Sequence, residues 1–403
     1  MISLSRKIFR DYRGLIFFSL TIFFFPILPL LFILFLISVF TNFRNSSVTV
    51  FIILIFTLLN FTRSIDSDWE NYLIYYKDLK NANIFYFFEE QFLTSVRITE
   101  PLFYVFSWVL SSLFNSNIFI FILCIVLLIY CTYYLSFKIL MNLVTNNSLE
   151  KLITIIIAFT VCLNFTESIH LVRQYISGSL LFYSFVLLIS NRILRFYFIC
   201  IIGFLFHNSL IVPLAILFIT YIIIKYLKIW EKSANRINSI FFIPVIVGLL
   251  FGLLSKNYLF LFSIEADKNE NTVYISMILE IFCFITCVIY FLNNFRKALI
   301  INNILILYIM FFISYVTFLI IIRENSLLFQ RFYLYLEWFR IVFIFPVIYF
   351  SPKIFKSHFV FIFIIFLSIL FLLLRIYRSP WQYLINSESI LCFSFLDLIK
   401  FLF

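Results

Sequence analysis

The stretch that decides the fold is ILILYIMFFISYVTFLIII, residues 304–322, which contains no charged side chain. At a rise of about 1.5 Å per residue, a helix of this length crosses the ~30 Å hydrocarbon core of a bilayer. A helix that is apolar on every side must be surrounded by lipid or by other apolar helices. Because charged residues stand at both ends, at Arg296–Lys297 and at Arg323–Glu324, the stretch predicts a transmembrane helix.

Similar apolar runs recur along the whole chain. Of its 403 residues, 64% are hydrophobic and 12% are charged, a balance that no soluble domain accommodates. We therefore predict an all-α polytopic integral membrane protein with a single membrane domain over residues 1–403. The number of apolar runs indicates about 11 to 14 transmembrane helices.

The cysteines and histidines do not suggest a metal site. All seven cysteines lie in or next to apolar runs, no Cys-x-x-Cys pair occurs, and the chain has only three histidines. We interpret the cysteines as small core residues and expect neither a metal nor a cofactor. The basic N-terminus precedes an apolar run that is too long for a signal peptide, so we interpret it as a retained anchor.

The net charge of +11 follows the topology of a membrane protein and does not indicate nucleic-acid binding. Basic residues cluster in short loops such as Lys138–Lys151 and Lys225–Arg236, which the positive-inside rule places in the cytoplasm. Acidic or neutral segments, including 62–100 and 166–170, fall between them and are predicted on the outer face. The alternation holds only if two apolar stretches form hairpins: residues 15–40, which Pro26 and Pro29 interrupt, and residues 196–224, as a broken or re-entrant hairpin.

The segment 62–100 is the only long loop and is predicted to lie outside the cytoplasm with interfacial helices. It places Asp66, Asp68 and Glu70 beside Trp69 and Tyr72. Carboxylates accept hydrogen bonds from sugar hydroxyls, and aromatic rings stack on the apolar faces of sugars. This pattern therefore favours a sugar-binding surface, with a solvated loop carrying aromatic membrane anchors as the alternative.

Several arginines near the predicted outer face are candidates for anion binding. Arg173 and Arg331 have no acid within one helical turn, so a ligand anion such as pyrophosphate is a suitable partner for them. Arg323 lies in an outer turn. Glu337 and Arg340 lie three residues apart and are able to neutralise one another.

His207 stands at the tip of the predicted hairpin, in the sequence His207-Asn208-Ser209. Non-helical backbone at membrane depth is tolerated only where protein or a water-filled cavity surrounds it. His207 is therefore a candidate acid or base, with a purely structural histidine as the alternative. The cytoplasmic loops are too short for a nucleotide-sugar domain, so any donor must come from the lipid phase or the outer compartment.

Five short motifs in a fixed order resemble the EpsG-like family, which is grouped with the Wzy polymerases of bacterial surface polysaccharides. The likeness spans roughly residues 40–350. The motifs are Arg63, Asp68-Trp69-x-Asn71-Tyr72, Glu100-Pro101-x-Phe103, Arg173-Gln174 and His207-x-Ser209, with Arg331 in a late helix as a weaker match.

The resemblance implies a glycosyltransferase with a GT-C-like helical architecture in the bacterial cytoplasmic (inner) membrane. Such an enzyme joins undecaprenyl-pyrophosphate-linked repeat units, as donor and acceptor, at the periplasmic or outer face, with a flippase and a chain-length regulator as possible partners. Its base would be Asp66, Asp68, Glu70 or His207. Substrate contacts would come from Arg63, Trp69, Tyr72, Glu100, Arg173, Gln174, Arg323 and Arg331.

Other classes of membrane protein share part of this pattern. A flippase or other transporter would need charge along an inward-facing cavity and often an internal repeat, and the chain shows no repeat. An O-antigen ligase has nearly the same requirements, and only the order of the motifs separates it from a polymerase. An O-acetyltransferase would need polar groups that extend across the membrane towards a cytoplasmic donor.

Overall fold

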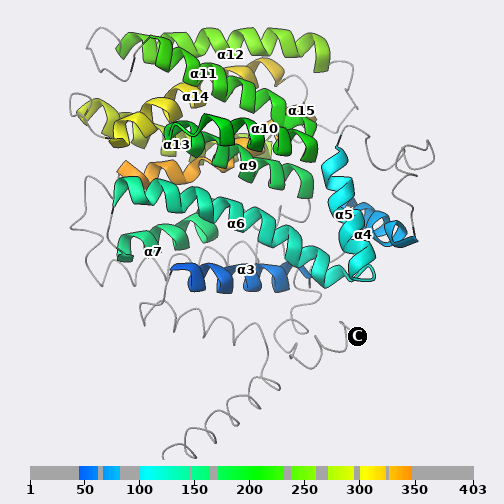
Figure 1. Ribbon diagram of the computed structural model, residues 1–403. Helices are drawn as coiled ribbons and strands as arrows, with labels where there is room; N and C mark the ends of the chain where they lie inside the picture. The colour runs from blue at the N-terminus through cyan, green and yellow to red at the C-terminus, as the bar shows by residue number, and fades with distance from the viewer. Residues whose placement is uncertain are drawn as a thin grey trace, which may run out of the picture. The chain divides into compact units, whose positions relative to one another are not determined.

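The computed structural model describes residues 45–61, 67–81, 100–145, 148–163, 171–227, 229, 237–259, 271–294, 300–323 and 326–346. Every regular element within these ranges is helical, and no strand occurs among them (Figure 1). The prediction of an all-α protein is confirmed.

The described helices follow one another in the order of the chain. Their bounds are α3 Asn45–Phe61, α4 Ser67–Asp78, η1 Leu79–Asn81, α5 Pro101–Leu113, α6 Ile118–Val144, α7 Ser148–Ile157, the π-helical η4 Ala158–Cys162, α9 Val172–Ile189, α10 Ile193–Phe206, η5 Asn208–Leu210, α11 Ile211–Tyr226, α12 Ile237–Leu259, α13 Asn271–Asn294, α14 Ile300–Ile322, α15 Ser326–Glu337 and η9 Arg340–Phe343.

Five of the described helical stretches are long and apolar enough to cross a membrane, which makes the chain a multi-pass membrane protein. Four further apolar helices among the described residues are shorter. The expectation of about 11 to 14 spans also depends on segments outside the described residues, and it stays a prediction. The five stretches are Ile118–Val144, Val172–Ile189, Asn208–Tyr226, Asn238–Ser255 and Ile301–Ile322.

The described residues belong to two compact units. The first contains α3, α4, η1, the C-terminal half of α5 and the N-terminal part of α6. Within this unit, the rings of Trp69 and Tyr76 on α4 stack on Phe121, at centroid distances of 6.4 and 4.1 Å. Ser111 Oγ donates to the Tyr76 carbonyl oxygen at 2.8 Å, so a polar contact also holds α4 in place.

The second unit contains the start of α5, the rest of α6 and all the described helices from α7 onwards. Within it α12 lies along α14, and two glycines allow the close approach (Figure 1). A Cβ added at Gly248 would collide with the Ser314 carbonyl oxygen, and one at Gly252 would collide with the Ile321 side chain. Small residues spaced four apart are a common means of bringing membrane helices together.

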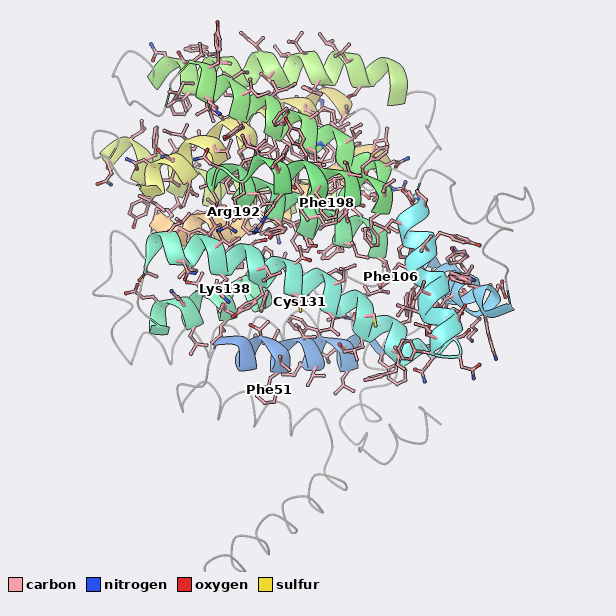
Figure 2. All side chains as sticks on the ribbon, viewed as in Figure 1. Phe51, Phe106, Cys131, Lys138, Arg192 and Phe198 are labelled. Atoms are coloured by element: carbon pink, nitrogen blue, oxygen red, sulfur yellow. The ribbon has the colours of Figure 1, made fainter. Side chains whose placement is uncertain are left out.

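The core of the second unit is aromatic. The indole of Trp338 packs against Tyr133 and Tyr175, with ring centroids 5.3 Å apart in both pairs. Gly178 on α9 makes room for this indole, since a Cβ there would overlap its Nε1 atom. Figure 2 shows that the side chains along these helices are mostly hydrocarbon. This packing fixes α9 against the segment that follows α15.

The helix break around residue 207 lies between α10 and α11. Helix α10 ends at Phe206, and His207 has extended backbone angles of φ −158° and ψ 114°. The three residues of η5 follow before α11 begins at Ile211. His207 still donates its backbone N–H to the Gly203 carbonyl oxygen at 3.0 Å, while its own carbonyl accepts from Leu210 N–H at 3.1 Å. The break is therefore a defined, hydrogen-bonded turn at which His207 leaves the helical conformation.

Candidate functional site: a buried glutamate shared by an arginine and a histidine

Glu100 is the centre of a charged cluster in the second unit. It stands immediately before Pro101, the first residue of α5, and is 1% exposed. One carboxylate oxygen, Oε2, accepts a hydrogen bond from Arg173 Nη1, and the other, Oε1, lies 2.5 Å from His207 Nδ1. A buried carboxylate needs partners of this kind, because burying an isolated charge is very unfavourable.

Arg173 is the second residue of α9 and is held on two sides. Besides its ion pair with Glu100, its guanidinium carbon lies 6.0 Å from the centre of the Phe103 ring, within the range of a cation–π contact. Its side chain remains 24% exposed. A guanidinium has five N–H donors in a planar fork, so one carboxylate oxygen does not exhaust its capacity. Arg173 is therefore positioned by protein groups and still partly accessible.

The fold corrects one expectation about Arg173. The sequence shows no acid within one helical turn of it, and this spacing favoured a ligand anion as the partner of its charge. The structure supplies Glu100 from a position 73 residues earlier in the chain. Contacts between helices that are distant in sequence cannot be seen from spacing along one helix, which is why the partner was missed.

The pKa values of the two ionisable partners of this cluster both shift downwards. Burial lowers the pKa of His207 below its ordinary value of 6.5, and the positive charges of Arg173 and Arg331 act in the same direction, while Glu100 opposes them. For Glu100, burial alone would raise the pKa, but the hydrogen bond and charge of His207 and the charge of Arg173 lower it overall. Burial and the two arginines thus disfavour the charged form of the imidazole, while the partners of Glu100 favour its ionised form.

Gln174 and Arg331 complete the surroundings of the cluster. Gln174 Nε2 donates to the backbone carbonyl oxygen of Arg331, which joins α9 to α15. The charge of Arg331 acts on the His207 pKa, so its guanidinium lies within electrostatic range of the imidazole. Among the described residues Arg331 has no ion-pair partner, and its side chain is partly exposed. Two arginines therefore share this neighbourhood, and only Arg173 is paired with a described acid.

A second buried ion cluster lies around Arg340. The pairing with Glu337 that their spacing allows is present, with Arg340 Nη2 2.9 Å from Glu337 Oε1. A further partner, Glu280 on α13, lies 2.5 Å from the same nitrogen, and no pattern along the chain predicts this contact. Glu337 Oε2 also accepts from the Tyr175 hydroxyl at 3.0 Å, which ties this cluster to α9.

The remaining predicted site residues are not part of the Glu100 cluster as described. Arg63 and Asp66 lie outside the described residues. Asp68 lies on α4, and its side chain is likewise not described. In the first unit Glu70 is exposed and Tyr72 is half-buried, while Arg323 is exposed at the end of α14 in the second unit.

Trp69 requires a correction. We expected its ring to be available for stacking on a sugar, but the indole is only 2% exposed and its face packs against Phe121. Tyr75 and Tyr76 on the same helix are also buried. Aromatic residues on a half-apolar helix bury themselves in the nearest core, since each buries a large apolar area. Trp69 therefore serves the core of the first unit in this structure.

Sequence reasoning also missed two buried residues beside the cluster. Ser177 on α9 and Tyr335 on α15 hydrogen-bond to one another at 3.1 Å, and the Tyr335 hydroxyl lies 2.9 Å from Ser209 Oγ. Ser209 belongs to the His207-x-Ser209 motif, but nothing in the sequence connects Ser177 or Tyr335 with it.

Fold and site together define a multi-pass, all-α membrane protein with a buried glutamate–arginine–histidine cluster at the ends of three helices. The family model described as the EpsG family matches residues 45–389, and the chain belongs to this family. The predicted resemblance is thereby confirmed. Comparison with curated proteins gave no match, and comparison with solved structures gave none either.

Proposed function

We propose that this protein is a membrane glycosyltransferase that polymerises undecaprenyl-pyrophosphate-linked oligosaccharide repeat units into O-antigen or a related surface polysaccharide. Membership of the EpsG family supports a role in polysaccharide biosynthesis. The observation that carries the chemical part of the proposal is the Glu100–His207–Arg173 cluster, which combines an oriented base with an anion-binding group.

The charge pattern supports a site on the outer face of the bacterial inner membrane. Glu100 and Arg173 adjoin acidic or neutral segments, whereas the basic segments that the positive-inside rule places in the cytoplasm lie at other helix ends. Both substrates would be lipid-linked and reach the site from the membrane. A flippase and a chain-length regulator are proposed partners.

His207 is the proposed general base. A histidine whose Nδ1 is held by a carboxylate presents Nε2 as the proton acceptor, the arrangement that orients the histidine of hydrolytic triads. The lowered pKa keeps the imidazole neutral and able to accept a proton at neutral pH. Asp66, Asp68 and Glu70 remain alternative bases, and His207 is favoured because Glu100 orients it.

In the proposed step, the hydroxyl oxygen of the acceptor sugar bonds to the anomeric carbon of the donor glycan. The bond from that carbon to the lipid pyrophosphate breaks, and its electron pair leaves with the pyrophosphate oxygen. The hydroxyl proton moves to His207 Nε2. Arg173 and Arg331 stabilise the negative charge on the departing pyrophosphate through charge-assisted hydrogen bonds. Gln174 would help by fixing the backbone that carries Arg331.

The proposal is tested in a bacterial strain that makes the cognate repeat unit but lacks its own polymerase. Expression of the chain is expected to produce a ladder of long-chain polysaccharide on a gel. A single repeat unit per lipid anchor, with the protein present in the membrane, would contradict polymerisation. A ligase would instead change the transfer of existing chains to the anchor, and a flippase would change the sidedness of the repeat unit without lengthening it.

A further inference from the structure

Three hydroxyl groups form a chain beside the proposed base. The Ser209 and Tyr335 oxygens are 2.9 Å apart, and the Tyr335 and Ser177 oxygens are 3.1 Å apart. Ser177 Oγ lies 3.0 Å from the backbone carbonyl oxygen of Gln174. The chain thus runs from the turn that follows His207, through α15, to the first turns of α9.

Each hydroxyl has only one proton to donate, and this fixes the direction in which the hydrogen bonds of the chain run. A carbonyl oxygen only accepts, so Ser177 uses its single proton on Gln174. Ser177 must then accept from Tyr335, and Tyr335, whose one proton is now used, must accept from Ser209. Each hydroxyl carries one donor and two acceptor lone pairs. Ser209 therefore donates its single proton to the Tyr335 hydroxyl oxygen, and its lone pairs can accept hydrogen bonds from a ligand.

Burial makes Ser209 the end of the chain that a ligand can reach. Ser177 and Tyr335 are almost completely buried, at 0% and 1% exposure, whereas Ser209 is partly exposed. The three elements that hold the chain also carry Arg173, Arg331 and the turn beside His207. A residue held by this chain has a fixed position relative to the proposed base, because the same helices position both.

We propose that Ser209 recognises the acceptor sugar by accepting a hydrogen bond from one of its hydroxyl groups, with its orientation imposed by Tyr335 and Ser177. This inference rests on the proposed function and deepens it, because it names a residue that selects the acceptor. Ser209 is a recognition residue, and Tyr335 and Ser177 are positioning residues that act through it. A sugar hydroxyl supplies the donor that the outward lone pairs of Ser209 require.

The test uses the full-length protein in lipid nanodiscs with the lipid-linked repeat unit as donor. The acceptor is the repeat-unit oligosaccharide freed of its lipid pyrophosphate, which is able to accept but not to donate, together with a set of its monodeoxy forms. Ser209→Ala is expected to raise the KM for this acceptor about 3- to 10-fold with kcat little changed, as for the loss of one neutral hydrogen bond. Ser209→Thr, which keeps the hydroxyl, is expected to restore most of the affinity.

The monodeoxy acceptors identify the contact directly. With the unaltered protein, one monodeoxy acceptor should bind more weakly than the parent acceptor. With Ser209→Ala, that monodeoxy acceptor and the parent acceptor should bind equally well. Tyr335→Phe keeps the packing of the ring but removes the acceptor for Ser209, and it should raise the same KM. Ser179→Ala is the matched control. Ser179 lies on α9, as Ser177 does, and it donates to the Ile176 carbonyl oxygen at 2.7 Å. The Ser179→Ala variant should leave the KM unchanged.

The outcomes separate the two proposals. If the unaltered protein makes no polymer from the lipid-linked donor, the proposed function fails first. A different result overturns only the role of Ser209. The unaltered protein then makes polymer, but the loss of affinity of each monodeoxy acceptor relative to the parent acceptor is the same in Ser209→Ala as in the unaltered protein. An equal rise in KM in the Ser179→Ala control would also overturn it, because the KM would then respond to the loss of a serine hydroxyl that is not part of the hydroxyl chain.

Discussion

At the scale of single residues, Glu100 controls the proton affinity of His207. The hydrogen bond and charge of Glu100 raise the pKa of His207, against burial and the two arginines, which lower it. Removing the carboxylate charge in Glu100→Gln should therefore lower the His207 pKa further. Since the base must be neutral to act, the acid side of the pH–rate profile should move to lower pH, while the maximal rate falls because the imidazole is less well oriented.

Arg331→Gln is the matching control, because it should shift the His207 pKa in the opposite direction from Glu100→Gln. Arg331 lowers the pKa of His207, so its removal should raise that pKa and move the acid side of the profile to higher pH. The measurement is the initial rate of polymer formation against pH in both variants and in the unaltered protein. Identical acid sides in all three proteins would show that a group other than His207 accepts the proton.

Arg173 has two possible contributions, and a pair of substitutions separates them. Arg173→Ala is expected to abolish the polysaccharide ladder, and Arg173→Lys to restore it only in part, because lysine lacks the planar fork of donors. The alanine variant also leaves the buried Glu100 without its arginine. The double variant Glu100→Gln/Arg173→Ala removes this uncompensated charge, so recovery of the ladder in it would show that Arg173 only neutralises Glu100. Continued absence of the ladder supports pyrophosphate binding.

The residues of the Glu100 cluster could be selected from the sequence, but their contacts could not. Glu100, Arg173 and His207 stand out because polar residues at helix ends are conspicuous in an apolar chain. Nothing in their spacing shows that one carboxylate serves both of the others. Trp69 illustrates the converse error, since the tryptophan that suggests sugar stacking packs on Phe121 instead. Tertiary packing decides which aromatic faces remain accessible.

At the scale of helices, apolar runs predicted most of the elements, but not which helices pack together. The run 304–322 lies within α14, and the helix break after α10 lies at the polar triplet that begins with His207. The packing of α12 on α14 depends on Gly248 and Gly252, and the sequence does not indicate which helix they contact. The π-helical turn η4 likewise has no sequence signal.

The two glycines of α12 should differ in their tolerance of a methyl group. At Gly248 the obstacle is the Ser314 backbone carbonyl, which cannot move without shifting α14, whereas at Gly252 it is the side chain of Ile321. Gly248→Ala should therefore lower the stability more than Gly252→Ala, with about 1–3 kcal/mol expected for overpacking that the backbone cannot relieve. Thermal unfolding of the two variants in the same detergent tests the order. Equal or reversed melting temperatures would contradict it.

At the scale of the whole molecule, helix α9 links the two proposed sides of the membrane. Arg173 stands at its start, and Arg192 follows its end at Ile189. The helix has 18 residues and, at about 1.5 Å each, a length close to the ~30 Å of the hydrocarbon core. We therefore predict that the two arginines lie near opposite membrane surfaces. The positive-inside rule predicts a cytoplasmic position for Arg192, with Arg195 three residues beyond it, and an outer position for Arg173.

This orientation predicts which positions a membrane-impermeant thiol reagent reaches from outside the cell. The test uses a chain whose seven native cysteines are replaced by alanine and that carries Ser168→Cys or Ser233→Cys. Position 168 precedes α9 on the proposed outer side, and position 233 belongs to the basic segment after α11. Labelling of intact spheroplasts should modify only the cysteine at position 168. Labelling after permeabilisation should modify both and serves as the control. Modification of position 233 alone in intact spheroplasts would reverse the topology and place the Glu100 cluster on the cytoplasmic face, where lipid-linked repeat units that have been moved outwards are out of its reach.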